Sequence, residues 1–91
     1  MLIELLLVPH CAFAEDARAL LVRCLADAGL TTPVVERVGD YPSPTVLIDG
    51  VDVMTGAVTL PAVQACRLDR PTAQRVLAAL QGRAVDAKDL P

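Results

Sequence analysis

The run LIELLLV at residues 2–8 constrains the fold more than any other part of this chain. It is almost continuously apolar, and Pro9 ends it before it reaches the length of an ordinary helix. A short apolar run of this kind is typical of a strand that is buried on both faces. We therefore expect residues 2–8 to form the central strand of a sheet covered by helices.

The rest of the core must be aliphatic as well. The chain is 54% apolar, yet its only aromatic residues are Phe13 and Tyr41. That apolar content excludes a disordered chain. A length of 91 residues corresponds to a single domain with a modest core.

Residues 12–28 have the periodicity of an amphipathic helix. Seven apolar residues recur there at spacings of three and four, namely Phe13, Ala17, Leu20, Leu21, Cys24, Leu25 and Ala28. Glu15 and Asp16 fall in the first turn, where acidic side chains complement the helix dipole. Gly29 follows as the expected stop of this helix.

Three further strands are predicted from β-branched runs and the turn residues between them. They are expected at residues 33–38, 45–48 and 51–54. The loop GDYPSP separates the first of these from the second. The dipeptide Asp49-Gly50 predicts a type I′ hairpin turn between the last two.

The C-terminal part of the sequence predicts one more helix. Residues 55–70 are expected to be irregular, and the helix is expected at residues 71–80 with Asp69 as a candidate cap. Gly82 is expected to end it, which leaves residues 83–91 as a tail.

The predicted fold class is therefore α/β, with the order β-α-β-β-β-α, two main helices and a four-stranded mixed sheet. The first two strands are expected to be parallel, because a helix connects them. The six-residue loop is too short to reach the other end of the sheet, so the third strand is expected to be antiparallel to the second. With the most apolar strand in the centre, the predicted strand order is 2-1-3-4.

Charge and composition exclude several partners. The net charge is −3 and no Lys/Arg cluster is present, which argues against nucleic acid and anionic membranes as partners. No segment approaches the ~20 apolar residues that cross a bilayer, and the N-terminal run carries Glu4 and lacks a basic region typical of signal peptides. We expect a cytoplasmic protein, and the oligomeric state stays open.

No cofactor is predicted, because the sequence has no Gly-rich phosphate loop. His10 is the single histidine, and the sequence shows no Ser/His/Asp catalytic set. One histidine also disfavours a zinc site of usual composition. The acidic residues are scattered and are expected to lie on solvated faces.

Three cysteines, an odd number, argue against a structural disulfide framework. Cys24 lies in the apolar stripe of the first helix and is expected to be a buried small hydrophobe. It is thirteen residues from Cys11 along the chain, on the order of 20 Å along a helix, which no disulfide spans.

Cys11 is expected at the carboxyl end of the central strand and at the amino end of a helix. Open α/β sheets place their sites at such ends, and free N–H groups there stabilise a thiolate. Glu15 and Asp16 oppose this because they add negative charge within about a turn. His10 either offsets that charge when it is protonated or faces solvent. Cys11 is thus either a reactive or metal-binding thiol or a partly buried, inert one.

Cys66 is the candidate partner of Cys11. The predicted topology carries residues 55–70 across the edge of the sheet where the central strand ends, which lets Cys66 approach Cys11. The two thiols would then form a disulfide or a two-thiolate site for a soft metal ion such as Hg(II), Cu(I) or Zn. Asp69 would supply a proton or cap the last helix, and a packed loop residue is the plain alternative for Cys66.

Three pieces of sequence resemble the thioredoxin-like fold in the same order along the chain. VPHCAFA, residues 8–14, resembles its strand–Cys-x-x-Cys–helix junction, with Cys11 at the first cysteine. SPTVLIDG, residues 43–50, resembles its cis-proline segment with Pro44 at the cis position, and the last helix matches the C-terminal helix of that fold. Ala14 stands at the second cysteine position, which indicates a monothiol variant that also lacks the helix between the second and third strands.

More narrowly, the chain resembles small bacterial thioredoxin-like proteins that are labelled alkylmercury lyase-like. That resemblance lies in Cys11, the SPTVLIDG segment and a second cysteine in ACRLD, residues 65–69. A cis Pro44 would place the backbone of Ser43 beside Cys11, where an extended peptide or thiol substrate could pair with it, flanked by Tyr41. A rigid loop is the alternative interpretation of this segment.

Three functions follow, and whether the chain is an enzyme stays open. The first is thiol redox or thiol transfer on a thiol or protein-disulfide substrate, with Cys11 as nucleophile and Cys66 as resolving thiol. In this reading His10, Tyr41, Ser43 and Pro44 contact the substrate. The second is the binding of a soft metal ion or organomercurial by Cys11 and Cys66. The third is a non-enzymatic interaction module.

Overall fold

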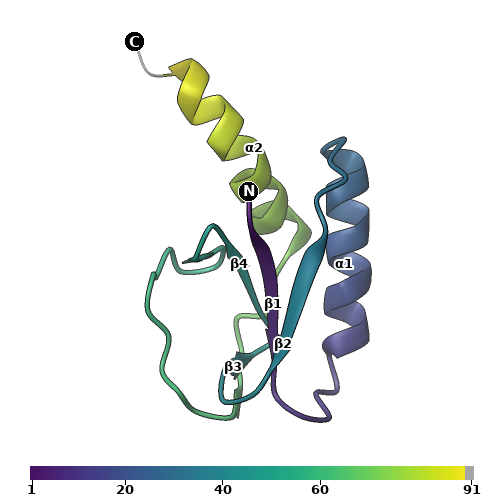
Figure 1. Ribbon diagram of the computed structural model, residues 1–91, viewed down its shortest axis with the longest axis vertical. Helices are drawn as coiled ribbons and strands as arrows, with labels where there is room; N and C mark the ends of the chain where they lie inside the picture. Colours follow the sequence, from purple (N-terminus) through teal and green to yellow (C-terminus); the bar gives the residue numbers. More distant parts are fainter. Residues whose placement is uncertain (90–91) are drawn as a thin grey trace.

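The computed structural model describes the backbone of residues 1–89 and the side chains of residues 1–81. Its elements, in chain order, are β1 (Ile3–Leu7), α1 (Ala14–Asp27), β2 (Val34–Val38), β3 (Pro42–Ser43), β4 (Thr45–Ile48), β5 (Val51–Asp52), β6 (Ala65–Cys66) and α2 (Ala73–Asp89). Figure 1 shows how they are arranged.

The apolar run at the start of the chain forms the central strand, as expected. Every residue of β1 is buried. β1 pairs in parallel with β2 and antiparallel with β4, and β4 pairs antiparallel with β5. The resulting order β2-β1-β4-β5 is the predicted order of the four strands, so the fold class and the mixed sheet are confirmed.

The two helices lie on one face of this sheet. Alternate β1 residues Ile3, Leu5 and Leu7 belong to one core cluster with Leu21 of α1 and Val76 of α2. These five side chains are at most 2% exposed. The two helices contact each other. In addition, α1 contacts β1 and α2 contacts β4.

An irregular segment, rather than a helix, covers part of the other face. Leu6 of β1 and Leu47 of β4 point to that face and share a hollow of about 240 Å³ with Leu60 and Pro61. In Figure 1 the loop between β5 and β6 lies on the opposite side of β1 from α1. Because this loop substitutes for a second helical layer, Leu6 is only 3% exposed.

The end of α1 confirms the helix stop predicted from sequence. Ala28 is the C-cap of α1. The next residue, Gly29, has a φ of +70°, which glycine adopts without a Cβ penalty. The Leu30 N–H bonds to the Leu25 carbonyl at 2.9 Å and the Gly29 N–H bonds to the Ala26 carbonyl at 3.1 Å. These two bonds define a Schellman motif.

The hairpin turn also matches its prediction. Asp49 and Gly50 have φ values of +51° and +80°, and a type I′ turn requires positive φ at both central residues. Asp49 in addition accepts a 2.8 Å hydrogen bond from the Leu2 N–H through its side chain. The turn is thereby tied to the start of the central strand.

The C-terminal helix differs from the prediction at both ends. Thr72, not Asp69, caps it, because the Thr72 hydroxyl accepts a 3.2 Å bond from the Arg75 N–H. The helix continues through Gly82 to Asp89, so the expected stop at Gly82 is wrong. A glycine inside a helix costs only about 1 kcal/mol relative to alanine, which the helix-forming residues around it offset. Residues 90 and 91 of the predicted tail lie outside the described residues.

A small second sheet appears where only irregular structure was expected. β3 and β6 pair in parallel, with Pro42 opposite Ala65 and Ser43 opposite Cys66.

Within the described part of the chain, no helix has both the length and the apolar character needed to cross a membrane.

Candidate functional site

Cys11 lies in the turn that connects the central strand to the first helix. β1 ends at Leu7, and α1 begins at Ala14 after an N-cap residue, Phe13, that makes no side-chain capping bond. The Ala14 N–H bonds to the Cys11 carbonyl at 3.3 Å. The Cys11 side chain is half-buried and packs against the core.

The hydroxyl of Ser43 contacts the Cys11 thiol directly. Ser43 Oγ lies 3.1 Å from Cys11 Sγ, with the hydroxyl as donor, and Ser43 is fully buried. The Ser43–Pro44 peptide bond is cis, as expected for this segment. This contact fixes the position of the Cys11 sulfur beside the backbone of β3.

Cys66 is brought to the same place through β6. Cys66 is the register partner of Ser43, about 5 Å away at ordinary strand spacing. Residues in register on neighbouring strands project to the same side of a ladder, so Cys66 lies on the side of β3 and β6 that faces Cys11. Cys66 is exposed, Cys11 is half-buried, and both are free thiols.

The two other predicted site residues are placed differently. The Tyr41 carbonyl accepts a 3.5 Å bond from the Ala65 N–H, so the backbone of Tyr41 takes part in the contact with β6. His10 is exposed on the turn before Cys11, with a φ of +58°. The structure therefore places Cys11 against the Ser43 hydroxyl, pairs Cys66 with Ser43 along the β3–β6 ladder, and leaves His10 exposed.

Cys24 is separate from this cluster, as expected. It is 1% exposed in the α1 core stripe, and its thiol lies 3.9 Å from the Ala73 carbonyl. Burial raises the pKa of the Cys24 thiol, the nearby Asp27 raises it further, and Arg23 lowers it. Because the neutral thiol is favoured, Cys24 is a structural residue.

A buried ion pair that the sequence did not predict anchors the segment carrying Cys66. Arg67 Nη1 donates to Asp52 Oδ2 at 2.9 Å and to Thr45 Oγ1 at 2.8 Å. The Arg67 and Asp52 side chains are 8% and 1% exposed. Asp52 also accepts a 2.9 Å bond from the Met54 N–H at its other oxygen. The Asp52 carboxylate therefore links the hairpin to residue 67.

The expectation that the acidic residues lie on solvated faces is wrong for two of them. Asp52 is 2% exposed, and Glu4 is 9% exposed and paired with Arg37 at 2.7 Å. Asp52 lies between Val51 and Val53, and this alternation predicts that its side chain faces solvent. The prediction fails because another segment covers that face. The segment that covers Asp52 carries Arg67, fifteen residues later in the sequence. The signal for this contact in the sequence was that arginine, next to Cys66.

Asp69 also contacts Arg67 and does not cap α2. It accepts bonds of 3.0 and 2.8 Å from the Arg67 guanidinium. The Arg67 hydrogen bond holds the pKa of the Asp69 carboxyl below its usual value. In return, Asp69 and then Asp52 raise the pKa of Arg67, while burial opposes them.

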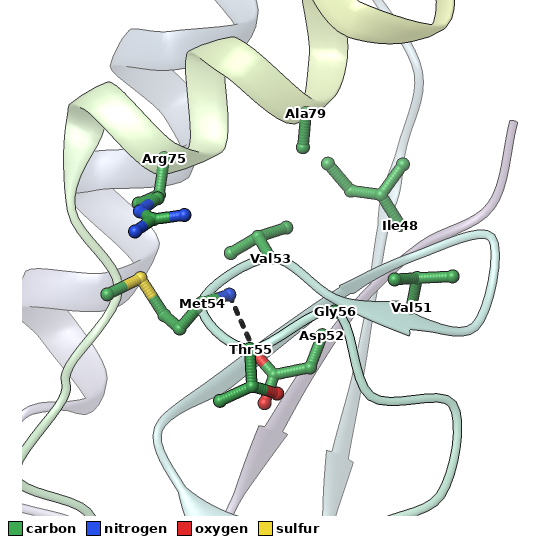
Figure 2. A pocket seen from close by; sticks show the side chains of 9 residues that line it. All are labelled: Ile48, Val51, Asp52, Val53, Met54, Thr55, Gly56, Arg75 and Ala79. Atoms are coloured by element: carbon green, nitrogen blue, oxygen red, sulfur yellow. Dashed lines mark hydrogen bonds between the residues drawn. The ribbon is translucent and has the colours of Figure 1, made fainter.

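A separate pocket of about 400 Å³ lies between the β4–β5 hairpin and α2. Figure 2 shows that polar and apolar side chains line it together, with Arg75 and Ala79 contributed by α2. The hairpin side contributes Ile48, Val53 and Met54. None of the cysteines lines this pocket, so it is not the thiol cluster.

Comparisons of the chain with models of known families, with curated proteins and with solved structures find no match. Among the described residues, no group of three or more His, Cys, Asp or Glu side chains is placed to hold a metal ion. The cluster is therefore interpreted from its own geometry, which joins a half-buried thiol, a hydroxyl donor and a second, exposed thiol.

Proposed function

We propose that this chain is a thioredoxin-like monothiol protein that exchanges thiols and disulfides through Cys11, with Cys66 as its resolving thiol. The observation that carries the proposal is the 3.1 Å hydrogen bond from the Ser43 hydroxyl to the Cys11 sulfur. The strand order and the position of Cys11 between the central strand and α1 support the thioredoxin-like assignment.

In the first step, the Cys11 thiolate attacks one sulfur of a substrate disulfide. A mixed disulfide forms between Cys11 and that sulfur, and the other substrate sulfur leaves as a thiolate that takes a proton from water. The Ser43 hydroxyl, which donates to this sulfur at 3.1 Å, orients it for the attack.

In the second step, the Cys66 thiolate attacks Cys11 Sγ in the mixed disulfide. The Cys11–Cys66 disulfide forms and the substrate sulfur is released as a thiolate. The pairing of Cys66 with Ser43 supports this step, because β6 keeps Cys66 next to the residue that contacts Cys11. A small thiol such as glutathione then reduces the Cys11–Cys66 disulfide and is itself oxidised, which suits the reduced cytoplasm expected from sequence.

The test follows alkylation of each cysteine by iodoacetamide at pH 7, read by mass spectrometry. Cys11 is expected to react at least tenfold faster than the buried Cys24. Ser43→Ala is expected to slow Cys11 about fivefold, because one hydrogen bond is worth about 1 kcal/mol. Cys66, which is exposed, is the internal control and its rate should not change. If Cys11 reacts no faster than Cys24, the proposal is wrong.

Glutathione disulfide tests the resolving role. In Cys66→Ser, a stable mixed disulfide of Cys11 with glutathione is expected to accumulate. In the unaltered chain it should be replaced by a Cys11–Cys66 disulfide, and Cys24→Ser is the matched control that should behave like the unaltered chain. Accumulation of the same mixed disulfide in both chains would remove the role of Cys66.

Soft-metal binding by Cys11 and Cys66 is the second candidate. It is favoured by two free thiols that both adjoin Ser43, Cys11 through a hydrogen bond and Cys66 through strand pairing. Because no third ligand is grouped with them among the described residues, only an ion that accepts two thiolates, such as Hg(II) or Cu(I), fits. A stoichiometric Hg(II) titration that is unchanged in Cys66→Ser would contradict this candidate.

A further inference from the structure

The backbone edge of β3 is occupied by a segment of the same chain. The Arg67 N–H donates to the Ser43 carbonyl at 3.0 Å, and the Ala65 N–H donates to the Tyr41 carbonyl at 3.5 Å. Extended peptides commonly bind proteins by adding a strand to such an edge. Residues 64–70, which we call the strap, thus fill the place beside Cys11 that an extended peptide would take.

The strap is held by polar contacts rather than by apolar burial. Ala65 and Cys66 are exposed, and Leu68 is 100% exposed. At one end, Gln64 donates to Asp40 at 2.8 Å. A hollow of about 310 Å³ lies beside Arg67 in the strap. A segment with few buried apolar contacts can leave its place without unfolding of the core.

One buried site holds the strap in register. The Arg67 guanidinium enters a pair of acceptors, Asp52 Oδ2 and Thr45 Oγ1, that belong to the main sheet. Asp52 accepts a bond from the Met54 N–H and the Thr45 hydroxyl donates to the Pro42 carbonyl, so each acceptor has a partner besides the guanidinium. A planar guanidinium suits such a site better than an ammonium does, because it donates several bonds in a fixed geometry.

The strap also spans the turn that holds Cys11. Arg70 lies 4.0 Å over the ring of Phe13, two residues after Cys11. At the other side, Ser43 contacts both the strap, through its carbonyl, and Cys11, through its hydroxyl. Whatever occupies the β3 edge is therefore beside the reactive thiol.

From these contacts we propose that the β3 edge and the Asp52–Thr45 acceptor pair form a peptide-recognition surface. Its ligand is an extended segment with a cysteine or another small residue opposite Ser43, followed directly by an arginine. The strap, with Cys66 and Arg67 in these positions, is the built-in occupant. The partner segment replaces it while the mixed disulfide forms, and the return of the strap to the β3 edge brings Cys66 back for the resolving step. The proposal rests on the proposed function, because the partner's cysteine is the one presented to Cys11.

The test uses a synthetic peptide copy of residues 62–69 with serine in place of Cys66, which binds without thiol exchange. The receptor is the Arg67→Ala variant, whose acceptor pair is free of the chain's own guanidinium. The peptide is expected to shift the backbone amide NMR signals of Ser43, Thr45 and Asp52. A matched control peptide that also has alanine in place of Arg67 should bind at least tenfold more weakly. In the unaltered chain, the strap competes and the first peptide should also bind at least tenfold more weakly.

Equal binding of the two peptides, or no binding by either at millimolar concentration, would overturn the proposal. If Arg67→Ala does not fold, hydrogen exchange in the unaltered chain decides the question. The amides of Ala65 and Arg67 are then expected to be at least tenfold less protected than those of Leu5 and Leu6. Equal protection would mean that the strap leaves only on global unfolding, which contradicts replacement by a partner.

The two proposals fail separately. Slow alkylation of Cys11 with selective binding of the arginine peptide would remove the thiol chemistry and keep the recognition surface. Fast alkylation with no selectivity between the peptides would do the reverse.

Discussion

Removal of the Arg67 charge is the perturbation that most directly tests how this fold is held together. Arg67→Met keeps most of the aliphatic volume of the side chain and leaves the Asp52 carboxylate, 1% exposed, without its cation. Breaking a buried pair by removing one partner costs about 3–5 kcal/mol, because the remaining charge stays desolvated. We expect the lower part of that range, since Asp52 keeps its 2.9 Å bond from the Met54 N–H.

Such a loss would be large for this chain. Domains are stable by about 0.05–0.15 kcal/mol per residue, which is roughly 5–14 kcal/mol for 91 residues. The free energy of unfolding is measured by urea denaturation, followed by far-UV circular dichroism because the chain has no tryptophan. The matched control is Arg18→Met, whose pair with Glu36 has side chains 44% and 37% exposed. It should cost less than about 1 kcal/mol.

A double-mutant cycle with Asp52→Asn completes this test. Asp52→Asn combined with Arg67→Met leaves no buried charge, so we expect the double variant to be more stable than Arg67→Met alone. A loss below about 1 kcal/mol for Arg67→Met, or simple additivity of the two changes, would refute the argument that the pair is desolvated and coupled.

Three further outcomes are expected. Gly50→Ala should destabilise the chain by about 1 kcal/mol in urea denaturation, because φ is +80° there while no atom lies within 4 Å of the added Cβ. An unchanged free energy of unfolding would contradict the positive φ assigned to this turn. The pKa of Asp69 is lowered in the folded chain, as is that of Glu36, so each carboxylate stabilises the fold above its unfolded pKa of about 4 and loses this contribution as the pH falls further. Asp69→Asn should therefore make stability fall less steeply in acid, and an unchanged pH profile would contradict the Asp69–Arg67 contact. Leu21→Ala, at a position 1% exposed, should cost about 2–5 kcal/mol of unfolding free energy, and a loss under 1 kcal/mol would contradict the assigned core.

Local sequence determined the main sheet and the first helix of this protein. The apolar run 2–8, the apolar periodicity of residues 12–28 and the stop at Gly29 all gave elements close to the observed ones. The Asp49-Gly50 turn was equally predictable, because positive φ at two successive residues is a local requirement of that turn. Strand orientation followed from connection length, since a short loop cannot return a strand to the far end of a sheet. Strand order followed from the central position of the most apolar strand.

Part of the thiol cluster was also within reach of the sequence. The proximity of Ser43 to Cys11 was expected from the resemblance of residues 43–50 to a cis-proline segment, while the Ser43–Cys11 hydrogen bond itself needed the structure. The end of α2 was missed because a glycine is a weak local signal inside otherwise helical sequence.

Only the tertiary structure decided how residues 55–70 are used. Their path depends on a buried contact between Arg67 and Asp52, fifteen positions apart, and on the pairing of β6 with β3. Neither partner has a periodic pattern of its own, because the pairing energy comes from desolvation and from backbone edges that exist only after the sheet has formed. The sequence by itself determined where the thiol of Cys11 would stand, and the folded chain decided that Cys66 pairs with Ser43 and that Arg67 pairs with Asp52.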